Sequence, residues 1–290
     1  MGGTTAMVGV GLLLAQEGKH VVLVNTDIEA PGLSSLFFPE NAINRGTLDC
    51  FLENRIGAAG KISDYTLSYD VNTVVDQASG SLTVIPAGRV DENYLSKLAR
   101  IDFQEYQPNS LSESLKSLLE DIDKAYPDTD YILLDARAGF HDLGGVTLGR
   151  IPHGDVLFGS HSDPSWSGIQ QAVRYAGRVQ GEEDEKMFLI MAASMSESRF
   201  SERYSGYLES FLRRSYEVFL ECYYGSSPPS LMAQGDAHYP VTIDYHPALN
   251  QNLHFYPMPG VSEEVCRAQI ALVMEKPYQE LTERIQAQFQ

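Results

Sequence analysis

Short, continuous runs of apolar residues, rich in valine, leucine and isoleucine, alternate along this chain with stretches where apolar residues recur at helical spacing. Continuous apolar runs of this kind predict strands, and they are typical of strands buried on both faces of a parallel sheet. The predicted strands begin at His20 (HVVLVN), Ser81 (SLTVIPAG), Asp130 (DYILLDARAG), Asp155 (DVLFGSHSD) and Lys186 (KMFLIMAAS).

Helical patterns fill the intervals between these strands. Residues 4–18 suit a largely buried helix that ends at a glycine, and leucine spacing predicts a second helix over residues 111–122. Further helical patterns cover residues 169–179 and the charged, tyrosine-rich region 194–224. This alternation predicts an α/β fold, with a mainly parallel sheet flanked by helices on both faces. No second domain is indicated, so we expect a single domain over residues 1–290.

Composition and charge narrow the choice of partners and compartment. The 290 residues carry a formal net charge of −18, which opposes nonspecific binding to DNA and to anionic membrane surfaces. The C-terminal PYQELTERIQAQFQ is amphipathic but poor in lysine and arginine, so we expect a core-docked or solvated helix and no membrane binding. The cysteines Cys50, Cys222 and Cys266 are far apart, which favours a reducing, cytoplasmic compartment.

The first helix starts directly after a pair of glycines and contains a pair of threonines. A glycine-rich turn into a helix holds phosphate on its backbone N–H groups, so Gly2, Gly3, Thr4 and Thr5 are candidate phosphate-binding residues. The alternative is a disordered tail followed by a helix N-cap, because threonine is also a common capping residue.

Two predicted strands end in an aspartate, Asp27 in NTDIEAPG and Asp135 in LLDARAG. The carboxyl ends of parallel strands share one edge of a sheet, which is where ligands bind in open α/β folds. Together with the Thr4 hydroxyl, these carboxylates would hold a hydrated Mg²⁺ against the phosphates of a nucleotide.

With these residues in place, the chain resembles the MinD/ParA-type ATPases, a SIMIBI-class P-loop family with the deviant Walker A motif K-G-G-x-G-K-T-T. The segment GGTTAMVGVGLLLAQEGKHVVLVNTDIEAPGLSSLF is similar to the family's P-loop helix, second strand and switch I. YILLDARAGFHDLGG resembles its Walker B strand and switch II. The resemblance covers about residues 2–180 and is greatest to the subgroup that carries EAPGL.

The resemblance implies a role for each matching residue. Thr4 would ligate Mg²⁺, Thr5 would meet the α-phosphate, Asp27 would orient the attacking water, and Asp135 would hold Mg²⁺ through water. Gly2, Gly3 and Gly139 would lie against the nucleotide. Arg137 would touch phosphate or a partner subunit, with a structural ion pair as its alternative. The family resemblance also implies ATP as the ligand and a homodimer as the assembly.

The chain departs from the family pattern at the phosphate-binding loop. Gly3 stands where the family has its lysine, and Asn25 replaces the acid often found two residues before Asp27. Met1 aligns with the variable loop residue, so we expect residues encoded upstream of it to supply a Val/Ile-rich strand followed by Lys-Gly-Gly.

Three functions therefore compete. The first is a nucleotide-dependent dimer switch that hydrolyses ATP and acts on an unidentified protein partner. The second is a noncatalytic protein-interaction module with weak or lost ATP binding. The third, an iron–sulfur reductase of the same class, is disfavoured because the cysteines do not suit a cluster.

Overall fold

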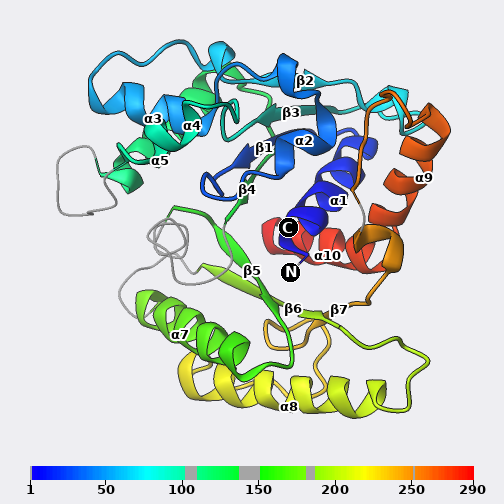
Figure 1. Cartoon of the computed structure of the whole chain (residues 1–290). Coiled ribbons are helices and arrows are strands. Elements are labelled where there is room, and N and C mark those ends of the chain that lie inside the picture. Colours follow the sequence, from blue (N-terminus) through cyan, green and yellow to red (C-terminus); the bar gives the residue numbers. More distant parts are fainter. Residues whose placement is uncertain (1, 102–109, 137–150, 181–186, 251) are drawn as a thin grey trace.

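The structure is a computed structural model that describes residues 2–101, 110–136, 151–180, 187–250 and 252–290. Its strands are mainly parallel and are flanked by helices (Figure 1), which confirms the fold class predicted from the sequence. The strands are β1 (His20–Asn25), β2 (Leu67–Tyr69), β3 (Ser81–Ile85), β4 (Tyr131–Asp135), β5 (Gly154–Gly159), β6 (Phe188–Ser194) and β7 (Val241–Ile243).

Hydrogen bonding divides the described strands into two groups. One group has the order β2-β3-β1-β4 and the other has the order β5-β6-β7. All pairs are parallel except β2 with β3. The sequence did not predict β2 or β7, because strands of three residues are too short to show a periodic pattern.

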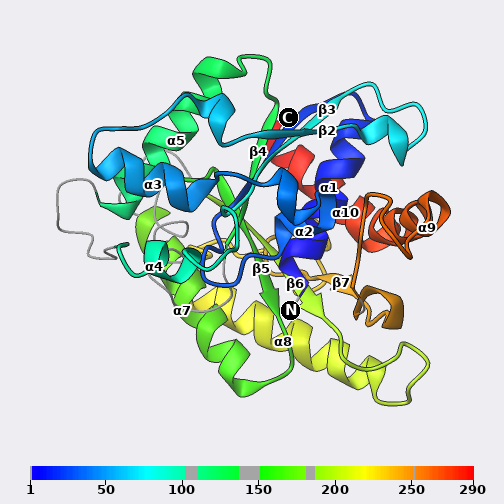
Figure 2. The same cartoon turned by 45° about the horizontal axis from the view of Figure 1, so that its top comes forward.

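Helices cover both faces of these strands (Figures 1 and 2). Helix α1 (Gly3–Gln16), α9 (Glu263–Val273) and α10 (Lys276–Gln286) share one apolar core with β1 and β3 of the first group and with β6 and β7 of the second. Helices α3 (Thr47–Arg55) and α5 (Leu111–Ala125) cover the other face of the first group. Helices α7 (Asp163–Gln180) and α8 (Tyr204–Cys222) cover the other face of the second group. The short helices are α2 (Leu33–Phe37) and α4 (Tyr94–Leu98).

Helix α1 lies between both strand groups and the C-terminal helices. Its sequence is apolar nearly all round, which is typical of a helix buried on every side. Helix α10 buries Tyr278, Leu281 and Ile285 in the same core, so the amphipathic C-terminal segment is a core-docked helix. Within the described parts of the chain, no helix is long and apolar enough to cross a bilayer.

Candidate functional site

The candidate site lies where the N-terminus of α1 meets the carboxyl ends of β1 and β4. The Thr4 hydroxyl donates to the Asp135 carboxylate, with 3.0 Å from Oγ1 to each of Oδ1 and Oδ2. Asp135 ends β4 directly beside Asn25, the last residue of β1. The parallel register therefore brings together side chains that are more than a hundred residues apart in the sequence.

Asp135 is buried, and its surroundings determine its protonation. Burial raises the pKa of the Asp135 carboxyl to about 6, the Thr4 hydrogen bond lowers it, and the Asp27 charge raises it. The backbone of Asp135 is held by Thr26, which donates both its N–H (3.2 Å) and its hydroxyl (2.7 Å) to the Asp135 carbonyl. A buried carboxylate held this firmly is suited to binding a cation, which would favour its charged form.

Asn25 is fully buried, and neither its Oδ1 nor its Nδ2 has a hydrogen-bond partner among the residues that the structure describes. Nearly all buried polar side chains in folded proteins are hydrogen-bonded, and an unsatisfied one costs about 1–3 kcal/mol. Such a cost is typical of a site that is completed by a ligand, an ion or a bound water. Asn25 is therefore the polar group of this site that most clearly lacks its partner.

Glycines form the entrance to α1. Gly2 has φ 109°, a conformation that strains any residue with a Cβ, and its carbonyl accepts the N–H of Ala6 at 2.9 Å. A Cβ at Gly3 would lie 3.7 Å from the ring of Phe158, an ordinary contact. Thr5 follows within the first turn of α1. The phosphate-binding residues predicted from the sequence thus stand together at this helix start.

Asp27 lies two residues beyond the end of β1 and is half-buried. Its Oδ1 accepts the backbone N–H of Ala30 at 3.1 Å, which fixes the carboxylate in the turn after β1. The negative charge of Asp27 contributes to raising the pKa of the Asp135 carboxyl. Arg137 and Gly139, the remaining predicted site residues, lie outside the described residues.

Sequence reasoning missed two residues of this region. The sequence pattern does not single out Thr26, between Asn25 and Asp27, although a hydroxyl residue at a strand end can bond the neighbouring strand, as Thr26 does here. Ser194 ends β6, and its Oγ would lie 3.9 Å from a Cβ built on Gly2. Only the tertiary structure indicates Ser194, because β6 and α1 are distant in the sequence.

The side chains present fit a magnesium ion that is only partly ligated by protein. The Thr4 hydroxyl, the Asp135 carboxylate and the Asn25 amide oxygen are hard oxygen donors, which Mg²⁺ prefers. No cluster of three or more His, Cys, Asp or Glu residues suited to a metal is found in the described part of the chain. Mg²⁺ commonly keeps several waters and binds one or two carboxylates together with substrate phosphates, so this small donor set is sufficient.

No protein-family model and no curated protein sequence matches this chain. Solved structures do match it. ParA of pnob8 has a TM-score of 0.58 at 14% identity, covering 99% of this chain and 95% of ParA. Apo McdA of Cyanothece has a TM-score of 0.56 at 15% identity, covering 98% and 94% of the two chains. Cobyrinic acid a,c-diamide synthase of Mycobacterium smegmatis, with bound ADP and magnesium, has a TM-score of 0.51 at 18% identity, covering 76% and 75%.

At such low identities the likeness shows the fold alone. The likeness to ParA and McdA extends over nearly the whole of each chain, so it includes both strand groups and the C-terminal helices. The helix-flanked, mainly parallel strands of this protein therefore have a fold similar to that of ParA and McdA.

Proposed function

We propose that this protein binds ATP with Mg²⁺ at the N-terminus of α1 and acts as a nucleotide-dependent dimer switch that hydrolyses ATP. The observation that carries the proposal is the Thr4–Asp135 pair, a hydroxyl and a buried carboxylate 3.0 Å apart at a helix start. A helix N-terminus favours phosphate through its N–H groups and dipole. Support from similar folds comes from an ATP complex of a Cyanothece McdA variant and the ADP–magnesium complex of the synthase.

Each residue of the site has a proposed task. Thr4 and Asp135 hold Mg²⁺, the former directly and the latter through water. The Asn25 amide oxygen accepts a hydrogen bond from a metal-bound water. Gly2, Gly3 and Thr5 bind phosphate oxygens, with Gly139 and Arg137 as further contacts. Asp27 orients the attacking water from the turn after β1. When bound, Mg²⁺ supplies charge neutralisation to the phosphates.

Nucleotide titration by calorimetry tests the magnesium site. We expect ATP binding that strengthens at least tenfold with Mg²⁺, and we expect Asp135→Asn to lose that gain because the variant lacks the carboxylate charge. Asp128→Asn is the matched control, since Asp128 is exposed in the turn before β4. An equal Mg²⁺ dependence in Asp135→Asn would contradict the role of this residue.

The noncatalytic module is the second candidate, and a specific observation favours it. Gly3 brings no cation to the phosphates, so ATP binding lacks a charge-assisted hydrogen bond worth about 1.5–3 kcal/mol. One assay, which combines sizing chromatography with a measurement of phosphate release, distinguishes the two functions. Dimerisation that requires ATP, together with phosphate release, supports the switch, whereas partner binding indifferent to ATP supports the module.

Restoring a lysine at the start of α1 is expected to strengthen ATP binding. Among the described residues, the new Cβ of Gly3→Lys meets the Phe158 ring at an ordinary distance, so the substitution causes no clash at Cβ. The added charge is expected to lower the Kd for ATP about tenfold to a hundredfold. Gly3→Gln, similar in length but neutral, is the control and should gain less. If Gly3→Lys gives no gain, the loop alignment and the roles of Thr4 and Thr5 are wrong.

A further inference from the structure

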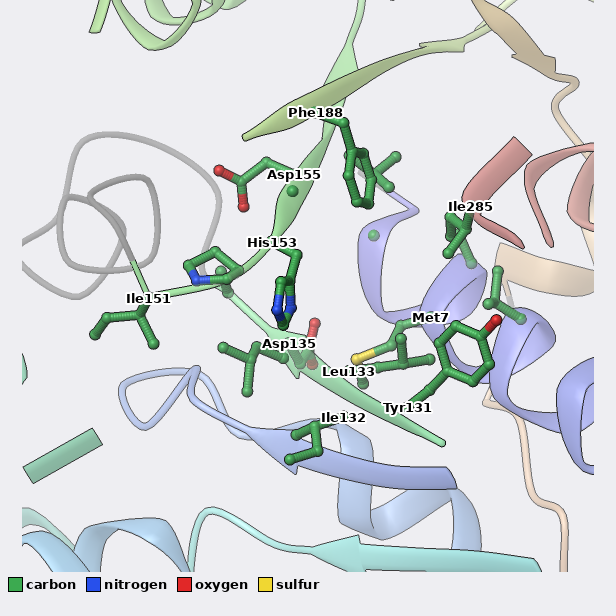
Figure 3. Close-up of a pocket in the computed structure, with 18 of the residues that line it drawn as sticks. Met7, Tyr131, Ile132, Leu133, Asp135, Ile151, His153, Asp155, Phe188 and Ile285 are labelled. Carbon is green, nitrogen blue, oxygen red and sulfur yellow. The ribbon is translucent and has the colours of Figure 1, made fainter. Parts of the chain in front are cut away.

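The turn after β1 carries Asp27, and hydrogen bonds fix the backbone on both sides of that residue. Before Asp27, Thr26 donates its N–H and its hydroxyl to the carbonyl of Asp135. The side chain of Asp135 is among those that line the cavity beside β4 (Figure 3). After Asp27, the N–H of Ile28 donates back to the Thr26 carbonyl at 2.9 Å. The backbone therefore closes a three-residue turn with Asp27 at its centre.

The Ile28 carbonyl is held by a distant element of the chain. Tyr94, the first residue of α4, donates its hydroxyl to that carbonyl at 2.8 Å. Tyr94 is 4% exposed and Ile28 is 0% exposed, and both belong to the apolar core beneath α3 and α5. A hydrogen bond in such a low-dielectric interior is stronger than one in water. The contact therefore restrains the turn firmly.

Tyr94 is itself anchored by the elements around it. A Cβ at Gly88, in the loop after β3, would lie 3.5 Å from the Tyr94 ring. Three residues along α4, Lys97 donates from Nζ to the Asp49 carboxylate of α3 at 2.8 Å, and this carboxylate also accepts the N–H of Gly46 at 3.1 Å. Helix α4 is thereby tied to α3, and Tyr94 joins the turn after β1 to the loop after β3.

The protonation state of Tyr94 suits a hydrogen-bond donor. Burial, followed by the charges of Asp49 and Asp27, raises the pKa of the Tyr94 phenol. The phenol therefore keeps its proton at neutral pH and donates it to the Ile28 carbonyl. A phenylalanine at this position would keep the ring and lose the donor, which would leave a buried carbonyl without this partner.

We infer that Tyr94 is a positioning residue for Asp27, an inference that rests on the function proposed above, in which Asp27 orients the attacking water. Tyr94 acts through the backbone. Thr26 fixes the peptide before Asp27, and the Tyr94 hydroxyl fixes the peptide after Ile28, so the Asp27 carboxylate keeps one place relative to Asp135. A displacement of about 1 Å in a reacting group is enough to slow an enzyme about a hundredfold.

The test uses two variants of the full chain that each remove one buried hydroxyl. Tyr94→Phe removes the proposed positioning contact. Tyr65→Phe is the matched control, because Tyr65 is 2% exposed in the same apolar core and its hydroxyl bonds to Glu53 and Gly60. Both variants lose a hydrogen bond from the core, so a difference between them reports the turn and not a general loss of stability.

Hydrogen exchange measured by NMR on the nucleotide-free protein follows the turn directly. The Ile28 amide donates to Thr26, and the Ala30 amide donates to Oδ1 of Asp27, so the second amide reports where the carboxylate lies. We expect exchange at both amides to quicken at least fivefold in Tyr94→Phe relative to Tyr65→Phe.

Phosphate release with saturating Mg²⁺ and ATP measures the consequence for the reaction. The kcat of Tyr94→Phe should fall at least fivefold, while its Kd for ATP by calorimetry stays within twofold of wild type, because Asp27 orients water and does not hold the phosphates. Tyr65→Phe should keep both values. In an Asp27→Ala background, Tyr94→Phe should change the residual kcat less than twofold, since the residue that it positions is absent.

Four results would overturn the inference and leave the proposed function standing. They are unchanged exchange at both amides of Tyr94→Phe, changed exchange with an unchanged kcat, an equal fall in kcat in Tyr65→Phe, and a further fivefold fall in the Asp27→Ala background. A wild type that releases no phosphate would instead overturn the proposed function, and this role of Tyr94 with it.

Discussion

Asp155→Asn is expected to raise the free energy of unfolding of the 290-residue chain at pH 8 by about 4 kcal/mol. Asp155 stands near the start of β5, and its Oδ2 is buried with no hydrogen-bond partner in the described parts of the chain. Burial raises the pKa of its carboxyl from 3.8 to about 7, so the folded protein resists ionising this group. Asparagine has a similar size and stays neutral, which removes the penalty of a buried, unpaired charge.

The pH dependence of this effect has a definite sign. Well below pH 3.8 Asp155 is protonated in both states, so wild type and Asp155→Asn should be nearly equal in stability. Between about pH 4 and 7 the unfolded chain loses the proton while the folded protein keeps it, so wild type loses stability as pH rises. Above about pH 7 the full difference is reached.

Urea unfolding followed by circular dichroism at pH 4, 6 and 8 measures the free energy of unfolding of wild type and of Asp155→Asn. The contributions of groups that titrate identically in both proteins cancel in the difference between the two values. Asp128→Asn, which removes an exposed carboxylate, is the control and should stay within about 0.5 kcal/mol of wild type at each pH. A constant difference between wild type and Asp155→Asn across this range would show that the Asp155 carboxyl is not the titrating group.

Gly9→Ala is expected to lower the free energy of unfolding by about 3 kcal/mol or more, although alanine is the better helix former. A Cβ at Gly9 would lie 2.1 Å from the backbone carbonyl oxygen of Val273 and 3.2 Å from the Tyr278 ring. A backbone oxygen cannot rotate out of the way, so α1 would have to move away from α9 and α10. That movement would open the core that α1 shares with both strand groups.

Gly206→Ala provides the matched control for this prediction. Gly206 lies in the first turn of α8, is exposed, and has nothing within 4 Å of an added Cβ. The same substitution there should raise stability by about 0.5–1 kcal/mol, because alanine loses less backbone entropy on folding. If the two variants change stability by the same amount and sign in thermal unfolding, the close approach of α1 to Val273 does not hold.

Local pattern was sufficient to predict the main elements of this fold. The apolar runs that begin at His20 and Ser81 became β1 and β3 with nearly their expected bounds, because buried parallel strands need continuous apolar sequence. Leucine spacing predicted α5 for a similar reason, since one face of that helix packs on the sheet. The placement of Thr4 at a helix start and of Asp135 at a strand end also followed from local sequence.

The meeting of Thr4 with Asp135, the unsatisfied amide of Asn25 and the position of Ser194 beside Gly2 depend on tertiary structure. Each involves residues from separate elements, and a residue pattern carries no distance between elements that are far apart along the chain. The roles of Thr4, Thr5, Asp27 and Asp135 remain predictions, since they concern a ligand.

The sequence by itself determined that buried strands alternate with helices and that carboxylates end two of those strands, because both properties follow from the order of neighbouring residues. Only the tertiary structure decided that the described strands form two hydrogen-bonded groups and that residues of β4 and β5 line a shared cavity. The sequences of β4 and β5 are apolar, like those of strands with a partner on both sides. Whether an edge has a partner depends on which chain segment lies beside it, and that is a property of the packed molecule.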